Sequence, residues 1–139
     1  MAKQYDQYIH EGITRLGMPA LTTDSSWTPN TDVYETPDSL VVKMEIAGIE
    51  KDDLSLTLND RMLIVRGYRH DHCRESRRGC VFRQMEIDYG EFERRIIIPR
   101  TVDGRRVRAQ FRNGFLHIEL PKATQTEHTT LTIIIEQAS

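Results

Sequence analysis

Residues that could bind a metal or take part in redox chemistry gather in one charged stretch, Tyr68–Gly79 (YRHDHCRESRRG), and directly after it. His70, His72 and Cys73 lie within four positions, and Cys80 follows Cys73 by seven. Zinc sites usually combine two well-spaced pairs of ligands, and this spacing is not one of their standard patterns. We therefore interpret the stretch as a solvated loop without a metal. The two cysteines lie in this one polar region and do not indicate a disulfide framework. A metal or redox site is the minor alternative, and pairing of the cysteines between subunits under oxidation is another.

Paired carboxylates could perform general acid–base chemistry, and two such pairs occur: Asp52 with Asp53, and Glu91 with Glu93. We interpret the first pair as the start of a turn and the second as the surface of a strand. The sequence contains no P-loop, no GxGxxG and no G-x-S-x-G. We therefore expect no catalytic residues, no cofactor and no enzymatic activity.

The length, net charge and apolar content of the chain limit the kinds of partner that it can bind. The 139 residues suffice for one domain, and 19 basic residues against 21 acidic ones leave a net charge of −2. Because the positive and negative charges nearly cancel, the chain has no net positive potential that would attract nucleic acid or an anionic membrane. No apolar run approaches the roughly 20 residues that span a bilayer, and the polar N-terminus does not look like a signal peptide. We expect a cytoplasmic protein without integral membrane association.

The elements that would position functional residues fall into three parts. Residues 1–26 form an N-terminal arm with apolar side chains spaced three or four apart, the pattern of a short helix. This arm either packs on its own domain or, as we favour, is available to other chains, because short isolated helices are marginal. Its apolar residues, our candidate client-binding set, are Tyr5, Tyr8, Ile9, Ile13 and Leu16.

Residues 27–122 change to a period of two, which is typical of strands. Apolar residues alternate with others from Leu40 to Ile46, from Leu54 to Leu58 and from Val107 to Phe111. Asn59-Asp60 indicates a turn, and Asn113-Gly114 is a strong signal for a two-residue hairpin. Several short strands without a helix-length segment predict an all-β, antiparallel β-sandwich.

Two segments do not fit a closed monomer. Val81–Ile87 has the pattern of a strand, yet it follows the charged loop inside a long excursion. One explanation is that it pairs with the sheet edge of another subunit. The C-terminal extension, residues 123–139, carries the apolar run LTIII near its end, and this run must be buried within or between chains.

At this point the chain resembles the small heat-shock proteins, the α-crystallin-domain family, of the bacterial and plant type. The resemblance covers residues 27–136, and five motifs in the right order and spacing make it specific. In chain order they are Trp27-Thr28-Pro29 with Asp32–Glu35, Leu63–Gly67, Gly90-x-Phe92-x-Arg94 with Ile98-Pro99, Ala109–Leu116 with Leu120-Pro121-Lys122, and Ile133-Ile134-Ile135.

The resemblance implies an immunoglobulin-like sandwich that forms a homodimer by strand exchange and assembles into a larger homo-oligomer. It also implies ATP-independent holdase activity toward non-native client proteins. A monomeric or dimeric co-chaperone or adaptor that binds a folded partner is the alternative. The implied dimer interface comprises Val81, Phe82, Arg83, Gln84, Met85 and Arg94.

Arg94 shares a face with Phe92 and Ile96 by alternation, so it is expected to be partly buried and to need an acidic partner. It is either an ordinary edge-strand arginine or, as the resemblance favours, half of an ion pair at the dimer interface. The acidic partner is left open.

The implied oligomer anchor is the tail pair Ile133 and Ile135, although Leu131 and Ile133 have the same spacing. Residues two apart in an extended segment face the same way, so such a pair can enter one groove together. The groove would lie between two strands and be formed by Leu54, Leu56, Leu58, Val107 and Ala109. Which of the three leucines face the groove and which face the core is left open, as is the question whether the tail binds its own or a neighbouring dimer.

Overall fold

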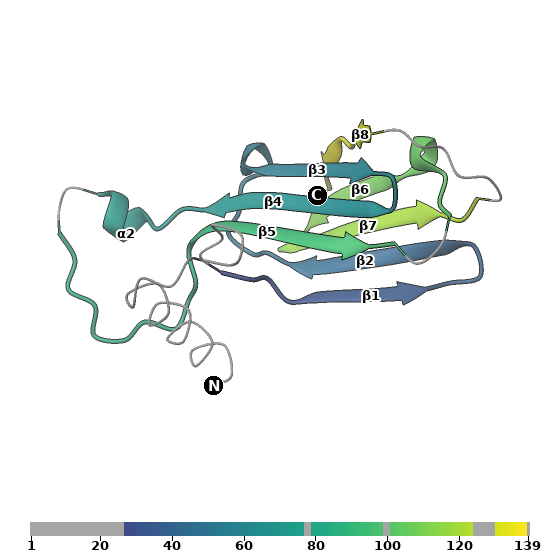
Figure 1. Ribbon diagram of the computed structural model, residues 1–139. Coiled ribbons are helices and arrows are strands. Elements are labelled where there is room, and N and C mark those ends of the chain that lie inside the picture. Colours follow the sequence, from purple (N-terminus) through teal and green to yellow (C-terminus); the bar gives the residue numbers. More distant parts are fainter. Residues whose placement is uncertain (1–26, 77–78, 99–100, 124–129, 139) are drawn as a thin grey trace, which may run out of the picture.

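The computed structural model describes residues 27–76, 79–98, 101–123 and 130–138. These residues form two β-sheets stacked face to face (Figure 1). The five-stranded sheet has the order β1 (Thr31–Glu35), β2 (Ser39–Glu45), β7 (Phe115–Pro121), β6 (Arg108–Arg112), β9 (Ile135–Gln137). The four-stranded sheet has the order β5 (Gly90–Ile97), β4 (Met62–Arg69), β3 (Leu54–Asn59), β8 (Thr130–Thr132). All strand pairs are antiparallel except β6 with β9. The prediction of an all-β, immunoglobulin-like sandwich is confirmed.

Helical structure is minor in the described part of the chain. It consists of the short α-helix α2 (His72–Glu75) and two 3₁₀ turns, η1 (Lys51–Asp53) and η2 (Gly104–Arg106). None of these helices has the length and apolar character needed to cross a bilayer.

The core follows from the alternation of apolar residues along facing strands. In the five-stranded sheet, Leu40 lies opposite Leu120 and Val42 opposite Ile118, and all four are at most 1% exposed. The other sheet contributes side chains of the same kind, among them Leu56, Leu63, Val65 and Phe92. Full burial of one such side chain stabilises a fold by about 1.5–3 kcal/mol. The inner faces of the two sheets therefore supply most of the stability that holds the sandwich together.

Both predicted turns are present, one of them displaced by a residue. Asn113 and Gly114 have φ values of 53° and 80° and connect β6 to β7, which confirms the hairpin. The Asn59-Asp60 turn is corrected: Asn59 still pairs with Met62, so the turn consists of Asp60, with φ of 57°, and Arg61. In the observed register Leu58 pairs with Leu63, so the ladder of β3 and β4 includes Asn59 and the turn begins one residue later.

The connection from β4 to β5 leaves the sandwich and protrudes beyond one end of it (Figure 1). We call residues 70–89 the excursion. Residues 81–87 have no strand partner in the single chain and are all exposed, so the pairing of Val81–Ile87 with a second subunit stays a prediction. A strand needs a neighbour to satisfy its backbone N–H and C=O groups, and this segment runs where no sheet edge of its own chain can supply one.

Candidate functional site

The C-terminal tail closes one open side of the sandwich. Strand β8 adds to the four-stranded sheet beside β3, where Leu131 lies opposite Leu58. Strand β9 adds to the other sheet beside β6, where Ile135 lies opposite Ala109. The tail thus crosses from one sheet to the other, and the amide of Ile133 donates to the carbonyl of Leu56 at 2.9 Å on the way.

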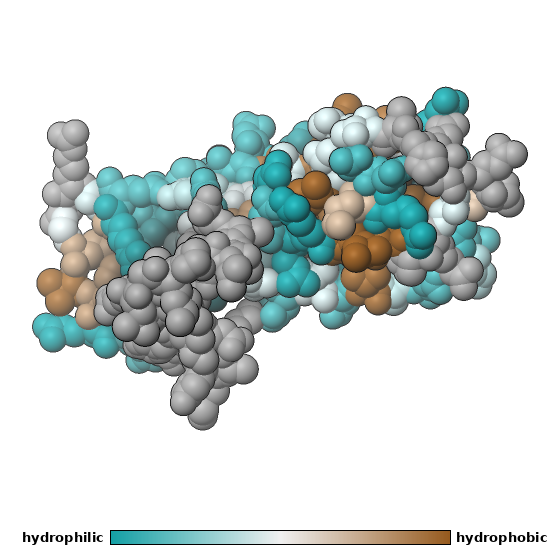
Figure 2. Space-filling model, viewed as in Figure 1, coloured by the Kyte–Doolittle hydropathy of each residue, from teal (hydrophilic) through white to brown (hydrophobic). Residues whose placement is uncertain are grey.

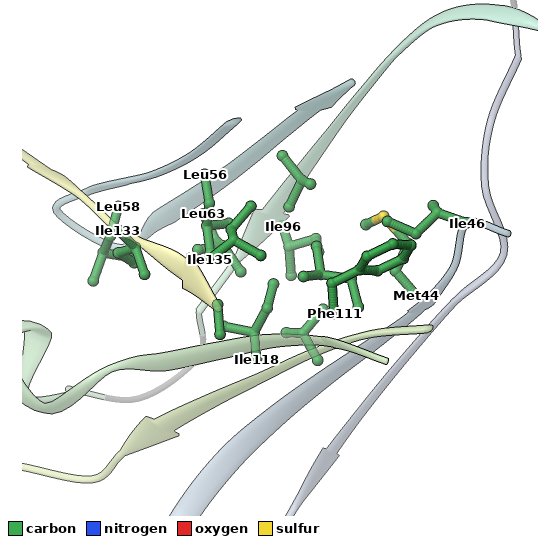
Figure 3. Close-up of a cluster of buried hydrophobic side chains, with 14 of the residues drawn as sticks. Met44, Ile46, Leu56, Leu58, Leu63, Ile96, Phe111, Ile118, Ile133 and Ile135 are labelled. Atoms are coloured by element: carbon green, nitrogen blue, oxygen red, sulfur yellow. The ribbon is translucent and has the colours of Figure 1, made fainter. Parts of the chain in front are cut away.

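Ile133 and Ile135 point into the apolar cluster between the sheets (Figure 3). They are 9% and 5% exposed, whereas Ile134 between them is 79% exposed. Alternation in an extended segment explains this contrast. Leu131 is only partly buried and packs over Gly104. Both isoleucines therefore lie in a groove of their own chain, and their role as an anchor between subunits stays a prediction.

The proposed groove residues line the place where the tail docks, with one exception. Leu56, Leu58 and Ala109 are buried beneath the tail strands, and Val107 lines a hollow together with Leu131. The exception is Leu54, which packs toward Gly67 and Phe92 farther along β3 (the leucine Cδ2 lies 3.0 Å from an ideal Cβ on the glycine). All three leucines of β3 face the inside, because Ser55 and Thr57 alternate with them.

The proposed dimer-interface residues of the excursion are brought together on its protruding part. Val81 is 82% exposed, Phe82 41% and Met85 38%, and Arg83 and Gln84 are exposed as well. Figure 2 shows apolar side chains on the excursion, away from the sandwich. The described part of the chain covers this apolar area only in part, through Arg74, whose guanidinium lies 5.8 Å from the ring centroid of Phe82 and 3.8 Å from Sδ of Met85.

Arg94 lies apart from the excursion, in the middle of β5. Its position opposite the buried Val65 places it on the inward face with Phe92 and Ile96. Its Nε is buried and has no hydrogen-bond partner within the described residues. A buried donor without a partner costs free energy, so the position suits an acidic group from another chain, and the ion pair stays a prediction.

Sequence reasoning did not identify the contact that fixes the base of the excursion, which is made by Arg69. Its Nε donates to the carbonyl of Asp88 at 2.7 Å, with Nη2 donating to the same oxygen, and its Nη1 donates to the carbonyl of Ala47 at 3.0 Å. The guanidinium stacks 3.9 Å from the ring centroid of Trp27, whose Nε1 donates to Gly90. Burial lowers the pKa of Arg69. The alternation along β4 could have indicated this contact. Arg69 lies an even number of positions after the inward-facing residues of that strand, so its side chain points to the same face.

A second contact, also not identified from the sequence, links the excursion to the sandwich through His70. Its Nδ1 lies 2.9 Å from Glu75 of α2, and its Nε2 lies 3.1 Å from Asp53 of η1. The hydrogen bond with Glu75, and to a lesser extent the charges of both carboxylates, raise the pKa of His70 above its ordinary value. His70 therefore holds α2 against the end of the sandwich.

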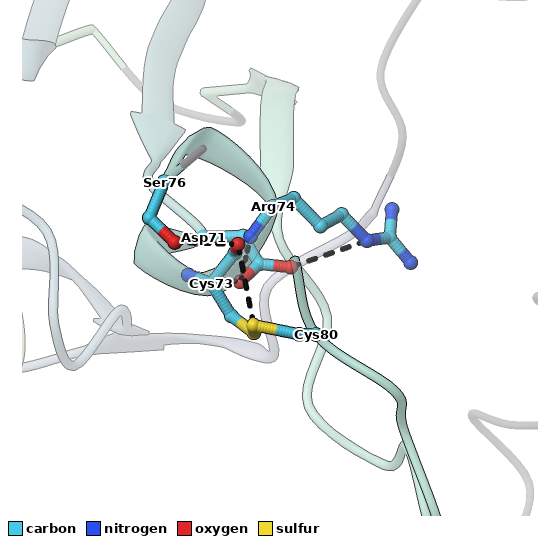
Figure 4. Close-up of a disulfide and its surroundings, with 5 residues drawn as sticks. All are labelled: Asp71, Cys73, Arg74, Ser76 and Cys80. Atoms are coloured by element: carbon cyan, nitrogen blue, oxygen red, sulfur yellow. Dashed lines mark hydrogen bonds and ion pairs between the residues drawn. A yellow bond between two sulfur atoms is a disulfide. The ribbon is translucent and has the colours of Figure 1, made fainter. Parts of the chain in front are cut away.

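The two cysteines require a correction, because Cys73 and Cys80 form a disulfide within the chain (Figure 4). Their Cα atoms are 6.1 Å apart. Asp71 makes this possible: its carboxylate accepts from the amides of Cys73 and Arg74, which caps α2 and turns the chain back toward Cys80. Among the described residues, no group of three or more His, Cys, Asp and Glu side chains is arranged to hold a metal ion.

The candidate client-binding residues of the arm, Tyr5, Tyr8, Ile9, Ile13 and Leu16, lie outside the described residues. The candidate site therefore consists of two separate surfaces on the described chain. One is the tail in its groove, and the other is the exposed apolar segment of the excursion.

A two-sheet sandwich with a protruding β4–β5 excursion and a tail that bridges the sheets defines an α-crystallin-type domain. The family model described as Hsp20/alpha crystallin family matches residues 32–136. The chain belongs to this family, the small heat-shock proteins.

Individual relatives agree with this assignment. Small heat shock protein C2 of Rickettsia felis is 29% identical over 104 residues, which are 75% of this chain and 66% of the relative. Spore protein SP21 of Stigmatella aurantiaca is 32% identical over 113 residues, 81% of this chain and 62% of the relative. The chain thus spans less than two thirds of the length of each of these relatives. The solved structure of heat shock protein 16.0 from Schizosaccharomyces pombe is 31% identical with a TM-score of 0.65, covering 73% of this chain and 94% of that one.

Proposed function

We propose that this protein is an ATP-independent holdase of the cytoplasm, a non-enzymatic chaperone that assembles with copies of itself and binds partly unfolded proteins. The observation that carries the proposal is the segment Val81–Ile87, whose apolar side chains are exposed on a protruding excursion. Exposed apolar area of this kind is covered either by another copy or by a denatured chain, and burial of apolar area needs no specific chemistry.

Dimerisation would use this segment as an added strand. Strand β1 is the outer edge of the five-stranded sheet, with β2 as its ladder partner. Val33 and Tyr34 on β1 are each 45% exposed. An extended segment from a second copy can pair its backbone with this edge and cover both side chains. The unpartnered Nε of Arg94 would then meet an acidic group of that copy.

Larger assembly would use the tail. Burial of Ile133 and Ile135 contributes about 3–6 kcal/mol, and ordering each tail residue costs about 1–2 kcal/mol of backbone entropy. The docked tail is therefore weakly held and can exchange between its own groove and that of a neighbour. Repeated around a closed assembly, such weak contacts become avid while each one can still open. When tails leave, Leu56, Leu58 and Ala109 become available to clients together with the arm residues Tyr5–Leu16.

One observation favours a second candidate function. The tail is docked in its own chain, which is the arrangement of a self-contained sandwich, so a monomeric or dimeric co-chaperone or adaptor for a folded partner is the alternative. Size-exclusion chromatography separates the two, since a monomer supports the adaptor and a large or polydisperse species supports the holdase.

The decisive experiment heats an aggregation-prone client protein without nucleotide and follows light scattering. Wild type should suppress scattering, and Ile133→Ser/Ile135→Ser should lower the mass of the assembly in solution. Ile134→Ser is the matched control, because the same chemical change falls on an exposed side chain and should leave the mass unchanged. Scattering that wild type does not reduce would rule out the holdase, and an unchanged mass of the double variant would rule out the anchor.

A further inference from the structure

The disulfide of the excursion lies where it can control the segment proposed to exchange between subunits. Cys73 is half-buried on α2 and Cys80 is exposed. Cys80 directly precedes Val81, the first residue of the apolar segment, and the chain contains two cysteines in all. Thiol chemistry at these two cysteines therefore acts within the excursion, directly before the segment.

The disulfide ties the start of the segment to the sandwich through two links. The first joins Cys80 to Cys73 on α2. The second holds α2 in place, through His70 between Glu75 and Asp53. At the other end of the segment, the backbone of Asp88 is bound by Arg69. In the oxidised chain, residues 81–87 thus run between two tied points, and without the disulfide the first tie is lost.

We propose that Cys73 and Cys80 form a redox-sensitive clip that sets how well Val81–Ile87 is preorganised for exchange with a second copy of the chain. The proposal rests on the strand exchange described under the proposed function. A segment held at both ends loses less conformational freedom when it pairs with a partner edge, so the oxidised chain dimerises more tightly. Reduction frees the loop and raises the dissociation constant of the dimer, roughly tenfold.

Closure of the clip requires an oxidant, for which a low-molecular-weight disulfide such as oxidised glutathione suffices. The thiolate of the exposed Cys80 attacks this disulfide, forms a mixed disulfide and releases one small thiol. The thiolate of Cys73 then attacks the sulfur of Cys80 and releases the second small thiol. In sum, two protein thiols lose two electrons and two protons, and one small disulfide becomes two small thiols. Excess reduced glutathione reverses both steps.

The test equilibrates the full chain with mixtures of oxidised and reduced glutathione and measures two quantities. Alkylation of free thiols followed by intact mass spectrometry reports whether the pair is closed within one chain. Sedimentation analysis over a concentration series reports the dissociation constant of the dimer. Wild type should show a constant roughly tenfold lower when oxidised. The Cys73→Ser/Cys80→Ser variant should match reduced wild type under both conditions, and both serines fall on the excursion outside the core.

The outcomes separate the clip from the proposed function. Dimers of equal strength in both redox states would overturn the clip and leave the exchange intact. A covalent dimer on a non-reducing gel, formed through sulfurs of different chains, would also overturn it. A wild-type chain that is monomeric in both states would overturn the exchange and with it the regulatory role, whereas the alkylation pattern would still show whether the intrachain disulfide closes.

Discussion

Protonation of the imidazole of His70 affects the position of the excursion, because the ring lies between two carboxylates. Since the raised pKa of the folded form lies above the unfolded value of about 6.5, the bridge to Glu75 and Asp53 stabilises the docked position of α2 fully below that value. This stabilisation is lost as the pH rises through the folded pKa. We therefore expect the amides of α2 to be better protected from hydrogen exchange at about pH 6 than at about pH 8, after correction for the intrinsic rate.

Two variants check this assignment. His70→Gln keeps a polar side chain but cannot become charged, so the protection of α2 should no longer change with pH. His117→Gln, on β7 of the sandwich, removes a histidine elsewhere and should keep the wild-type pH dependence. If His70→Gln retained that dependence, another group would control the docking of α2.

At the scale of the elements, the packing of β4 on β5 has no room for a side chain at Gly67. A Cβ there would lie 2.4 Å from Cε1 of Phe92 and 3.0 Å from Cδ2 of Leu54. The Phe92 ring is 2% exposed and packs edge-on against Trp27 at 5.2 Å, so it cannot move without disturbing the core. We expect Gly67→Ala to lower the free energy of unfolding by about 1–3 kcal/mol in urea titrations. The control Ser55→Ala, on the outer face of β3, should change it by less than about 0.5 kcal/mol.

The same elements show how far local pattern determines the structure. The alternation from Leu40 to Met44 and the turn at Asn113-Gly114 depend on neighbours in the sequence, and both were predicted from it. The contacts that were missed depend on chain segments far apart. His70 contacts Asp53, and Arg69 donates hydrogen bonds to the carbonyls of Ala47 and Asp88.

Two features of the excursion depend on more than local sequence pattern, for separate physical reasons. Val81–Ile87 has the composition of a strand, but a strand forms only where a partner supplies the other half of the ladder. The disulfide was not predicted, because the spacing of Cys73 and Cys80 does not show that the turn at α2 brings the two side chains together. The position of the tail could not be decided either, since Ile133 and Ile135 fit a groove of their own chain as well as an identical groove of another.

At the scale of the whole molecule, the excursion protrudes from one end of the sandwich while the tail lies along the β3–β6 side (Figure 1). The two surfaces share no residue, so contacts made through one do not occupy the other. A subunit with two independent contacts can build assemblies larger than a dimer. Loss of one contact should therefore reduce the assembly without unfolding the subunit.

This separation gives a prediction for the excursion. In the single chain the side chains of Val81, Phe82 and Met85 are exposed and contact none of the core. Their combined replacement by Ser, Ser and Gln should leave the urea midpoint of the monomer nearly unchanged, because little apolar area is lost from the fold. The proposed strand exchange, in contrast, should fail, and the mass of the species in solution should fall in sedimentation analysis, with contacts through the tail still possible.

Ile97→Ser is the matched control for this variant. Ile97 is 69% exposed on the outer face of β5, so its loss removes a comparable apolar side chain from the surface without touching the excursion. Its assembly should remain that of wild type. Equal loss of mass in both variants would mean that apolar surface in general drives association, and an unchanged mass in the triple variant would show that Val81–Ile87 is not the exchanged segment.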